Sequence, residues 1–292
     1  MKSYLLRDES DVQSMRDLIA RLPGGSTVVD FEEALQMSTV RQSARLWPAE
    51  NGLAAFAWVD AYNNLVFDLD PRQSSAELET EIVTWGLAIM RKRNAGSGEP
   101  STLDASCQAA NLERIALLER NGFRREEIRS LHYARSLEEP LPEVPLPQGF
   151  ALRAAHGEQE VEALVALHRA AFGTGQMTVE YRLAIMRAPE YVPDLDLVVT
   201  APDGELCALC ICGFEEPGSL VGYTDPIGVH AAYQGRGLGK AVVSAGLRLL
   251  RQRGAKRAEL GTSSENLPMQ RLAESLGFAV VSESVWFSKE VA

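Results

Sequence analysis

Basic charge is scarce in this sequence, which has 29 lysines and arginines against 40 aspartates and glutamates. The formal net charge is -11 and the isoelectric point lies near 5.0. A general nucleic-acid binder needs a basic face to neutralise phosphates. The composition therefore excludes that class of protein and is compatible with a cationic or amine-bearing partner.

Long apolar runs are also missing. The first residues, MKSYLLRDESDVQ, carry charges too early for a secretory signal, and no apolar run is long enough to span a bilayer. We therefore expect a cytoplasmic protein with no membrane partner.

Cysteine occurs only four times, and three of the four lie in one run, CALCIC. The run contains a C-x2-C spacing, but a zinc site needs a second pair of ligands and none is nearby. Apolar residues alternate with the thiols. The run therefore indicates a buried strand in which Cys207, Cys210 and Cys212 act as small hydrophobic side chains, and we expect no metal site.

What the sequence does contain is an internal repeat. Residues 111–123, NLERIALLERNGF, match residues 266–278, NLPMQRLAESLGF, at an offset of 155 positions. Upstream, TWGLAIMRKR at 84–93 matches SAGLRLLRQR at 244–253, at an offset of 160. The chain therefore contains two copies of one domain of ordinary size.

A proline-rich segment, EEPLPEVPLPQG, separates the copies and cannot continue a helix or a central strand. We expect it to be a stiff, extended linker. The predicted division is a first domain at 1–137, a linker at 138–148 and a second domain at 149–292.

The second copy has a readable order of elements. Apolar periodicity and turn signals predict β-α-α-β-β-β-α-β-α-β, with room for one more final strand. Asn266 can cap the last helix, which we expect to end near Leu276 with Gly277 as its stop.

The most informative stretch is VHAAYQGRGLGKAVV, residues 229–243, where three glycines alternate before an expected helix. Glycine lets backbone N–H groups approach a ligand, and a helix start is positive. Both features favour a phosphate or pyrophosphate, and Arg236 and Lys240 add positive charge. A P-loop is excluded, because Gln234 replaces its first glycine and Ala241 lacks a hydroxyl for magnesium. A dinucleotide fingerprint has a different spacing, and a plain strand-to-helix turn is the alternative.

The pattern Q-x-x-G-x-G of Gln234, Gly237 and Gly239, with the strand before it and the closing N-x11-GF segment, resembles the GNAT superfamily of N-acetyltransferases. The resemblance covers residues 149–292, and IGVHAAYQGRGLGK is especially similar to the mycothiol synthase branch, which also has two tandem domains. It implies an α/β (α+β) fold of two tandem GNAT-like domains, each a mostly antiparallel mixed sheet flanked by helices. It also implies acetyl-CoA as the acyl donor.

The same resemblance assigns cofactor contacts. Backbone groups of Ile227, Gly228 and Val229 would face the pantetheine arm and the thioester, and Asn266 would lie near the cofactor. The loop that would wrap the pyrophosphate comprises Gln234, Gly235, Arg236, Gly237, Leu238, Gly239 and Lys240.

The first copy lacks this loop. Ser75, Glu77 and Glu79 stand where the second copy has its three glycines. Two carboxylates in a pyrophosphate cradle would repel the ligand. We predict that the first domain has lost cofactor binding and is structural or helps to shape the acceptor site.

Amide formation from a thioester needs a neutral amine and a group that takes its proton. Family members often place a glutamate six residues before the position of Val229, and here that position holds Tyr223. Asp225 should lie on the same strand face by alternation. Asp225 is therefore the first candidate base, acting through water, and Tyr223 is the second. An Asp-Pro turn is the alternative role for Asp225.

Many family members also carry a tyrosine on the last helix as the acid for the leaving thiolate, and here that position holds Ala273. A thiolate can leave without a strong acid because an ordinary thiol has a pKa of about 8.5. Ser263 or Ser264 could donate instead. The mycothiol synthase branch would be expected to keep both the glutamate and the tyrosine. His230 should point to the other face as a surface or loop residue.

These features predict a cytoplasmic N-acetyltransferase that moves an acetyl group from acetyl-CoA to a primary amine of a small molecule by direct attack. One alternative is a catalytically silent acyl-CoA-binding module, which Tyr223 and Ala273 favour. The other is acetyl transfer to a peptide or protein amine. We expect no nucleic-acid partner.

Overall fold

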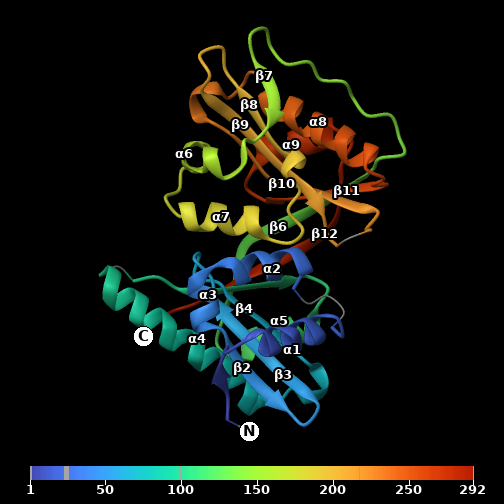
Figure 1. Ribbon diagram of the computed structural model, residues 1–292. Helices are drawn as coiled ribbons and strands as arrows, with labels where there is room; N and C mark the ends of the chain where they lie inside the picture. Colours follow the sequence, from blue (N-terminus) through green and yellow to red (C-terminus); the bar gives the residue numbers. More distant parts are fainter. Residues whose placement is uncertain (1, 23–25, 99, 217, 292) are drawn as a thin grey trace. The chain divides into compact units, whose positions relative to one another are not determined.

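The computed structural model describes residues 2–22, 26–98, 100–216 and 218–291. The chain forms two compact units (Figure 1). Unit 1 contains the residues up to Ser130 together with those from Glu283 onward, and unit 2 runs from Leu131 to Ser282. Two strands, β6 (Arg124–Ser136) and β12 (Ala279–Lys289), have one part in each unit.

Unit 1 contains both strands and helices. They are β1 (Tyr4–Leu5), α1 (Glu9–Ile19), α2 (Val28–Gln36), α3 (Ser38–Ser43), β2 (Arg45–Ala49), β3 (Gly52–Val59), β4 (Leu65–Leu69), η1 (Pro71–Gln73), α4 (Ala76–Ser97), β5 (Leu103–Gln108) and α5 (Leu112–Arg120).

An antiparallel sheet in the order β1-β2-β3-β4 forms the centre of unit 1, and β5, β12 and β6 follow one another in a second set of strands. Phe56 of β3 packs on Phe31 of α2 with ring centroids 5.9 Å apart. The neighbouring Ala55 and Ala57 belong to a core that contains Ile82 of α4. Because side chains alternate along a strand, helices cover both faces of this sheet.

Unit 2 repeats this plan in the order that the sequence predicts. Its elements are β7 (Ala151–Ala154), η2 (Gly157–Glu160), α6 (Val161–Phe172), α7 (Val179–Arg187), η3 (Pro193–Leu195), β8 (Asp196–Thr200), β9 (Leu206–Phe214), β10 (Val221–Val229), η4 (Ala231–Tyr233), α8 (Leu238–Gln252), β11 (Arg257–Ser263) and α9 (Leu267–Ser275), followed by β12.

The strands of unit 2 lie in the order β7-β8-β9-β10-β11-β6. The pairs from β7 to β10 are antiparallel, and β10 pairs with β11 in parallel. Helix α8 packs on one face of the sheet, and α6 and α7 pack on the other. This arrangement confirms the predicted mostly antiparallel, mixed sheet flanked by helices.

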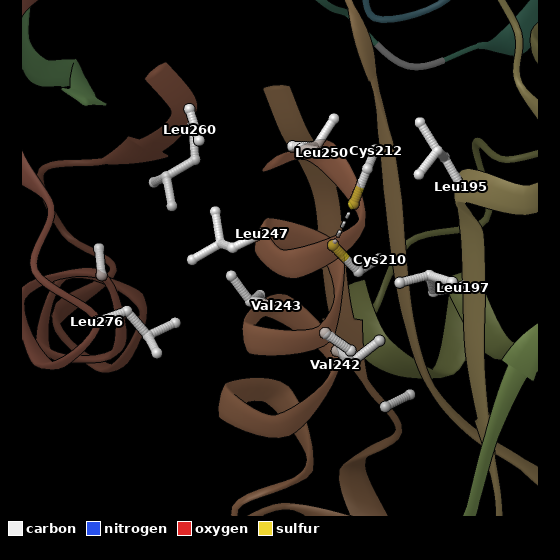
Figure 2. Packing of buried hydrophobic residues seen from close by; sticks show 14 of the residues in the cluster. Leu195, Leu197, Cys210, Cys212, Val242, Val243, Leu247, Leu250, Leu260 and Leu276 are labelled. Carbon is white, nitrogen blue, oxygen red and sulfur yellow. Dashed lines mark hydrogen bonds between the residues drawn. The ribbon is translucent and has the colours of Figure 1, made fainter. Parts of the chain in front are cut away.

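The cysteine run forms the centre of β9, as predicted. Figure 2 shows Cys210 and Cys212 directed from β9 toward α8, with their sulfur atoms 3.5 Å apart, among Leu197, Val242 and other apolar side chains. A Cβ on Gly246 of α8 would lie 2.5 Å from Sγ of Cys212, so this glycine lets the helix come close to the sheet. The thiols fill the core as small hydrophobic groups.

The compact units differ from the linear division of the sequence at two strands. Leu131, Tyr133 and Leu137 belong to the core of unit 2, although the repeat assigns them to the first domain. Val285 and Phe287 of β12 belong to the core of unit 1, where β12 pairs with β5. Each copy therefore gives the later part of its last strand to the other unit, and a pattern of similar residues along the chain cannot show such an exchange.

The proline-rich segment has no helix or strand in residues 140–147, as predicted for a linker. It is not a free spacer, however. Ser244 of α8 donates a hydrogen bond of 2.5 Å to the carbonyl oxygen of Pro142. Leu141, Val144 and Leu146 pack against the core of unit 2. The segment is therefore fixed to unit 2.

Candidate functional site

The predicted pyrophosphate loop connects β10 to α8. Gly235 has a φ of +73° and Gly237 a φ of +79°, which is the left-handed region that favours glycine. A Cβ at either position would meet no described atom within 4 Å. Both glycines therefore set the path of the backbone and leave open space above it.

Helix α8 begins directly after this loop. Its N-cap residue is Gly237, and among the described residues no side chain caps the helix start. The backbone N–H groups of the first turn thus remain available for an anion, and the helix dipole favours one there. The exposed Arg236 and the half-buried Lys240 add positive charge beside it. These groups fit a pyrophosphate.

Gly239 has a different role from the other two glycines. It is buried, and a Cβ there would lie 3.1 Å from Cδ1 of Leu272 and 3.2 Å from Cγ2 of Val229. This glycine lets α8 pack closely against α9 and β10. Leu238 is also buried, in the core beneath the helix. Any contact of these two residues with a ligand is limited to the backbone.

Tyr233 anchors the start of the loop. The sequence did not predict this role. Its hydroxyl donates a hydrogen bond of 2.7 Å to Oε2 of Glu205, and this bond raises the pKa of Tyr233 to about 12. Its ring lies 6.1 Å from that of Phe150, and the Arg236 guanidinium carbon lies 5.4 Å from the ring centroid. The amide of Gln234 donates to the carbonyl of Val229 over 3.3 Å.

His230 lies at the end of β10, and its Nδ1 accepts a hydrogen bond of 3.1 Å from the backbone of Ala232. It therefore caps η4 as a loop residue, in agreement with the expected role. Its Nε2 lies 4.0 Å from Oε1 of Glu205.

The described pairing of β10 with β11 covers only part of both strands, and we call the stretch beyond the last pair, beside the loop, the gap. Among the described residues, their paired positions run from Val221 and Arg257 to Tyr223 and Glu259, although both strands continue further. Ile227, Gly228 and Val229 pair with β9 on their other side. The edge of β10 toward β11 therefore offers backbone groups to an extended ligand such as a pantetheine arm.

Asp225 lies at this gap. The side chain is exposed, and Oδ2 is 3.5 Å from the position that a Cβ on Gly261 of β11 would occupy. The peptide bond to Pro226 is cis. Asp225 is thus placed between the two strands, where a carboxylate can take a proton from a group bound in the gap.

The expected alternation along β10 is wrong, because the strand contains a bulge. Thr224 pairs with Cys212 and Ile227 with Cys210, so β10 has one residue more than β9 over this interval. Tyr223 and Val229 therefore lie on opposite faces of the sheet rather than on the same face. A residue count back from Val229 does not give the side-chain direction across this bulge.

The bulge also separates the two candidate bases. The hydroxyl oxygen of Tyr223 would lie 2.4 Å from a Cβ on Gly213, so the phenol ring crosses the neighbouring strand β9. Asp225 lies toward β11, on the other side of β10. The structure therefore places Asp225, and not Tyr223, beside the gap.

The remaining predicted residues lie at the end of β11 and in α9 with its N-cap. Asn266 is its N-cap, and the side-chain oxygen accepts a hydrogen bond of 3.2 Å from the backbone of Met269. Ala273 is completely buried in the core of unit 2. The hydroxyl of Ser263 accepts a bond of 3.1 Å from the backbone of Glu265. Ala273 therefore offers no proton donor, and Ser263 has a structural role.

In unit 1, the junction of β4, η1 and α4 has the same order of elements as the junction of β10, η4 and α8 in unit 2, but its residues differ. Asp70 caps η1 as His230 caps η4, by accepting from a backbone N–H two residues later. Ser75 caps α4 and accepts a hydrogen bond of 3.2 Å from the backbone of Leu78. The start of α4 is therefore satisfied by its own side chain, whereas the start of α8 is not.

The carboxylate of Glu79 is not left free beside this junction, which the predicted repulsion of a ligand would require. It is buried and accepts hydrogen bonds from Arg120 of α5 at 2.7 and 2.5 Å and from Ser74 at 2.6 Å. The Arg120 bond lowers the pKa of the Glu79 carboxyl. The carboxylate is thus part of the internal packing of unit 1.

Arg114 fills the corresponding gap of unit 1. This residue of α5 donates to the carbonyl oxygen of Phe67 on β4, and its guanidinium carbon lies 3.2 Å from the centroid of the Phe67 ring. Phe67 corresponds to Ile227 at the offset of 160. An arginine of the chain itself therefore lies at the edge of β4. The corresponding edge of β10 in unit 2 lies beyond the last described pair with β11.

The described residues contain no group of three or more histidine, cysteine, aspartate or glutamate side chains that could hold a metal ion. They also include no helix with the length and apolar character needed to cross a membrane. A hollow of about 740 Å³ lies in unit 1 beside α4, lined by residues that include Arg45 and Trp85. None of its lining residues belongs to the predicted site.

Sequence comparisons identify relatives of this chain. A family model described as "Acetyltransferase (GNAT) family" matches residues 161–278. The mycothiol acetyltransferase of Actinosynnema mirum is 33% identical over 242 residues, which are 79% of this chain and 78% of the relative. That of Salinispora tropica is 36% identical over 152 residues, or 50% of each chain. The chain thus spans about half the length of several curated relatives that it matches.

Solved structures share the fold. A tandem GNAT protein from the clavulanic acid biosynthesis pathway has a TM-score of 0.72 and 16% identity, over 99% of this chain and 98% of its own. A GCN5-related N-acetyltransferase from Sphaerobacter thermophilus has a TM-score of 0.69 and 22% identity, over 99% and 95%. Together with the sequence matches, these likenesses show that the chain belongs to the GNAT family of acetyltransferases, whose acetyl donor is acetyl-CoA.

Proposed function

We propose that this protein transfers the acetyl group of acetyl-CoA to a primary amine of a small molecule, and that unit 2 holds the acetyl-CoA. The observation that carries this proposal is the start of α8, which no side chain of the described residues caps, beside the part of β10 that lies beyond its last described pair with β11. The glycine loop supplies N–H groups for the pyrophosphate, and the strand edge supplies partners for the pantetheine arm. Both lie within unit 2.

The proposed reaction is a direct attack. The lone pair of the neutral amine forms a bond to the thioester carbonyl carbon, the bond from that carbon to sulfur breaks, and the thiolate leaves. Asp225 takes the proton that the amine nitrogen loses, directly or through one water. Backbone groups of Ile227 to Val229 orient the thioester. Because Ala273 offers no proton, the thiolate would leave without an acid from α9.

We infer the class of acceptor from the charge of the site and from the names of the curated relatives. Curated relatives are named mycothiol acetyltransferase, so their acceptor is the first molecule to test. The exposed carboxylate of Asp225 favours an amine, because it attracts the cationic form, which must release one proton to solvent before the neutral amine attacks. A catalytically silent acetyl-CoA-binding protein is the second candidate, because Ala273 is buried and the Tyr223 ring lies over β9.

The test is release of free thiol from acetyl-CoA in the presence of separate amines. The panel contains the acceptor of the mycothiol acetyltransferases, amino sugars, polyamines and peptides with free N-termini. Release that depends on a small amine supports the proposal, and release only with peptides overturns the small-molecule acceptor. Acetyl-CoA binding in calorimetry without release by any amine supports the silent binding protein.

A further inference from the structure

A small chamber lies inside unit 2, directly under the bulge of β10. Its walls come from α6, α7, β9 and β10, and its volume is about 10 Å³. That is about the size that one water molecule needs. The wall from β10 is Pro226, the residue next to Asp225. Most of the other lining residues are apolar, and His168 and Arg182 are the two polar ones.

These two polar residues are at least nine-tenths buried, with 9% of His168 and 4% of Arg182 exposed. Among the described residues, no group makes a hydrogen bond with Nδ1 of His168 or with Nη1 of Arg182. A buried polar atom without a partner costs free energy, so native proteins nearly always supply one. One water can accept from Nη1 and donate to Nδ1, which satisfies both atoms.

The charges around the chamber favour that arrangement. Another nitrogen of Arg182, Nη2, is paired with Oδ2 of Asp196, which also accepts a hydrogen bond of 2.6 Å from the hydroxyl of Tyr191. Burial, and then the nearby Arg182 guanidinium, lower the pKa of His168 to about 4. The imidazole is therefore neutral at neutral pH. If Nδ1 accepts a hydrogen bond, the single ring proton is on Nε2.

We propose that the chamber binds one water molecule that bridges Nδ1 of His168 to Nη1 of Arg182, and that this bridge makes His168 a positioning residue for the bulge of β10. The water site is inferred from the two buried nitrogen atoms, Nδ1 of His168 and Nη1 of Arg182, and does not depend on the proposed function. The effect on the bulge rests on the proposed function, because it acts through Asp225.

Helix α6 touches β10 at two neighbouring points on this face. His168 and Pro226 line the same chamber. One turn later in α6, the ring centroid of Phe172 lies 4.4 Å from that of His168. A Cβ on Gly228 would lie 3.0 Å from Cε2 of Phe172. The orientation of the His168 ring therefore sets the surface on which Pro226 of the bulge and Gly228, just after the bulge, rest. A shift of this surface moves Asp225, which lies between β10 and β11.

The first test is the protonation state of His168 in the whole protein. Nitrogen-15 spectra of labelled protein, assigned by comparison with His168→Phe, distinguish a proton on Nε2 from one on Nδ1. We expect Nε2–H and no titration of His168 between pH 8 and about pH 5. The groups that face it are Arg182 from α7, with Asp196 of β8 and Tyr191 behind it. A proton on Nδ1, or titration near the ordinary value of 6.5, overturns the bridge.

The second test is a crystal structure at a resolution that shows ordered water. A water within hydrogen-bond distance of both atoms is the expected result. A dry chamber, or a direct bond between His168 and Arg182, contradicts the water site. Neither of these two tests uses activity, so they separate this inference from the proposed function.

The third test is kinetic. His168→Phe removes the acceptor, and we expect kcat to fall about tenfold to a hundredfold, as a small misplacement of a reacting group does, with unchanged acetyl-CoA affinity. His168→Asn keeps an acceptor oxygen and should restore most of kcat. His156→Phe is the matched control, because its side chain is 65% exposed and lies outside the chamber. An unchanged kcat in His168→Phe overturns the positioning role.

Discussion

The two units present the same junction between a strand, a short turn and a helix, but only one leaves it open. In unit 2, α8 starts at Gly237 without a side-chain cap, whereas in unit 1 the hydroxyl of Ser75 caps α4. Beside the junction, Arg114 donates a hydrogen bond to the backbone carbonyl of Phe67 in unit 1, whereas the described pairs of β10 with β11 in unit 2 end at Tyr223. We therefore propose that unit 1 keeps the fold and has lost the ligand site because its own side chains occupy that site.

The largest expected effect comes from giving unit 2 a feature of unit 1. Gly237→Glu places a carboxylate at the open start of α8, where the repulsion of a pyrophosphate should weaken acetyl-CoA binding on the order of a hundredfold or more. Calorimetry measures the affinity. The fold should persist, because the position is open and acidic groups suit a helix start.

Gly237→Ala is the matched control for that change. It imposes the same left-handed backbone conformation, at a cost of roughly 1–2 kcal/mol, without adding charge. It should weaken binding much less than Gly237→Glu does. Equal losses in the two variants would mean that backbone shape, and not charge, decides the difference between the units.

Asp225→Asn should lower kcat by about a hundredfold at neutral pH, because the amide cannot take the proton of the amine. The affinity for acetyl-CoA should change little. Steady-state kinetics and calorimetry on the same samples separate the two effects. Tyr223→Phe is the companion variant, and its loss of kcat should be much smaller, since the phenol lies over β9. A larger loss in Tyr223→Phe would reverse the two assignments.

In unit 1, Glu79→Gln should lower the free energy of unfolding by roughly 1–3 kcal/mol at neutral pH, because it removes charge-assisted bonds to a buried carboxylate. Acetyl-CoA affinity should not change. The pKa of Glu79 is lower in the folded protein than its ordinary value of 4.5. Its stabilisation is therefore present above about pH 4.5 and is lost as the pH falls through the folded-state pKa.

Urea unfolding of Glu79→Gln and of the unchanged protein at pH 7 and at low pH checks that prediction. The two proteins should differ at pH 7 and become more alike in acid. A weaker affinity for acetyl-CoA in Glu79→Gln would contradict the purely structural role of this residue.

The smallest expected effect concerns the support of the loop in unit 2. Tyr233→Phe removes the hydrogen bond to Glu205, and because that bond is exposed to solvent we expect only a small loss of affinity for acetyl-CoA, which calorimetry measures. Glu205→Ala removes the same bond from the other side. If the bond carries the effect, the double variant should be little worse than either single variant.

Local patterns predicted much of this molecule. The alternation in CALCIC gave a buried strand, the N-x11-GF segment gave α9 with Asn266 as its cap, and the spaced glycines gave an open helix start. In each case the residues that decide the structure are close together in the sequence. Their propensities and periodicities are therefore readable without knowledge of tertiary contacts.

The features that the sequence did not predict depend on residues far apart. The bulge of β10 is defined by its register with β9, and it overturned the expected face of Tyr223. The exchange of β6 and β12 between the units depends on strand pairing. Glu79 was expected to repel a ligand, but its partner Arg120 lies 41 positions away. None of these contacts leaves a pattern within a short segment.

The measurement that tests the central claim most directly is the number of acetyl-CoA molecules that bind to one chain, determined by calorimetry. The account predicts one site per chain, which disappears in Gly237→Glu and persists in Glu79→Gln. Two sites per chain, or binding that survives in Gly237→Glu, would contradict the assignment of acetyl-CoA to unit 2 alone.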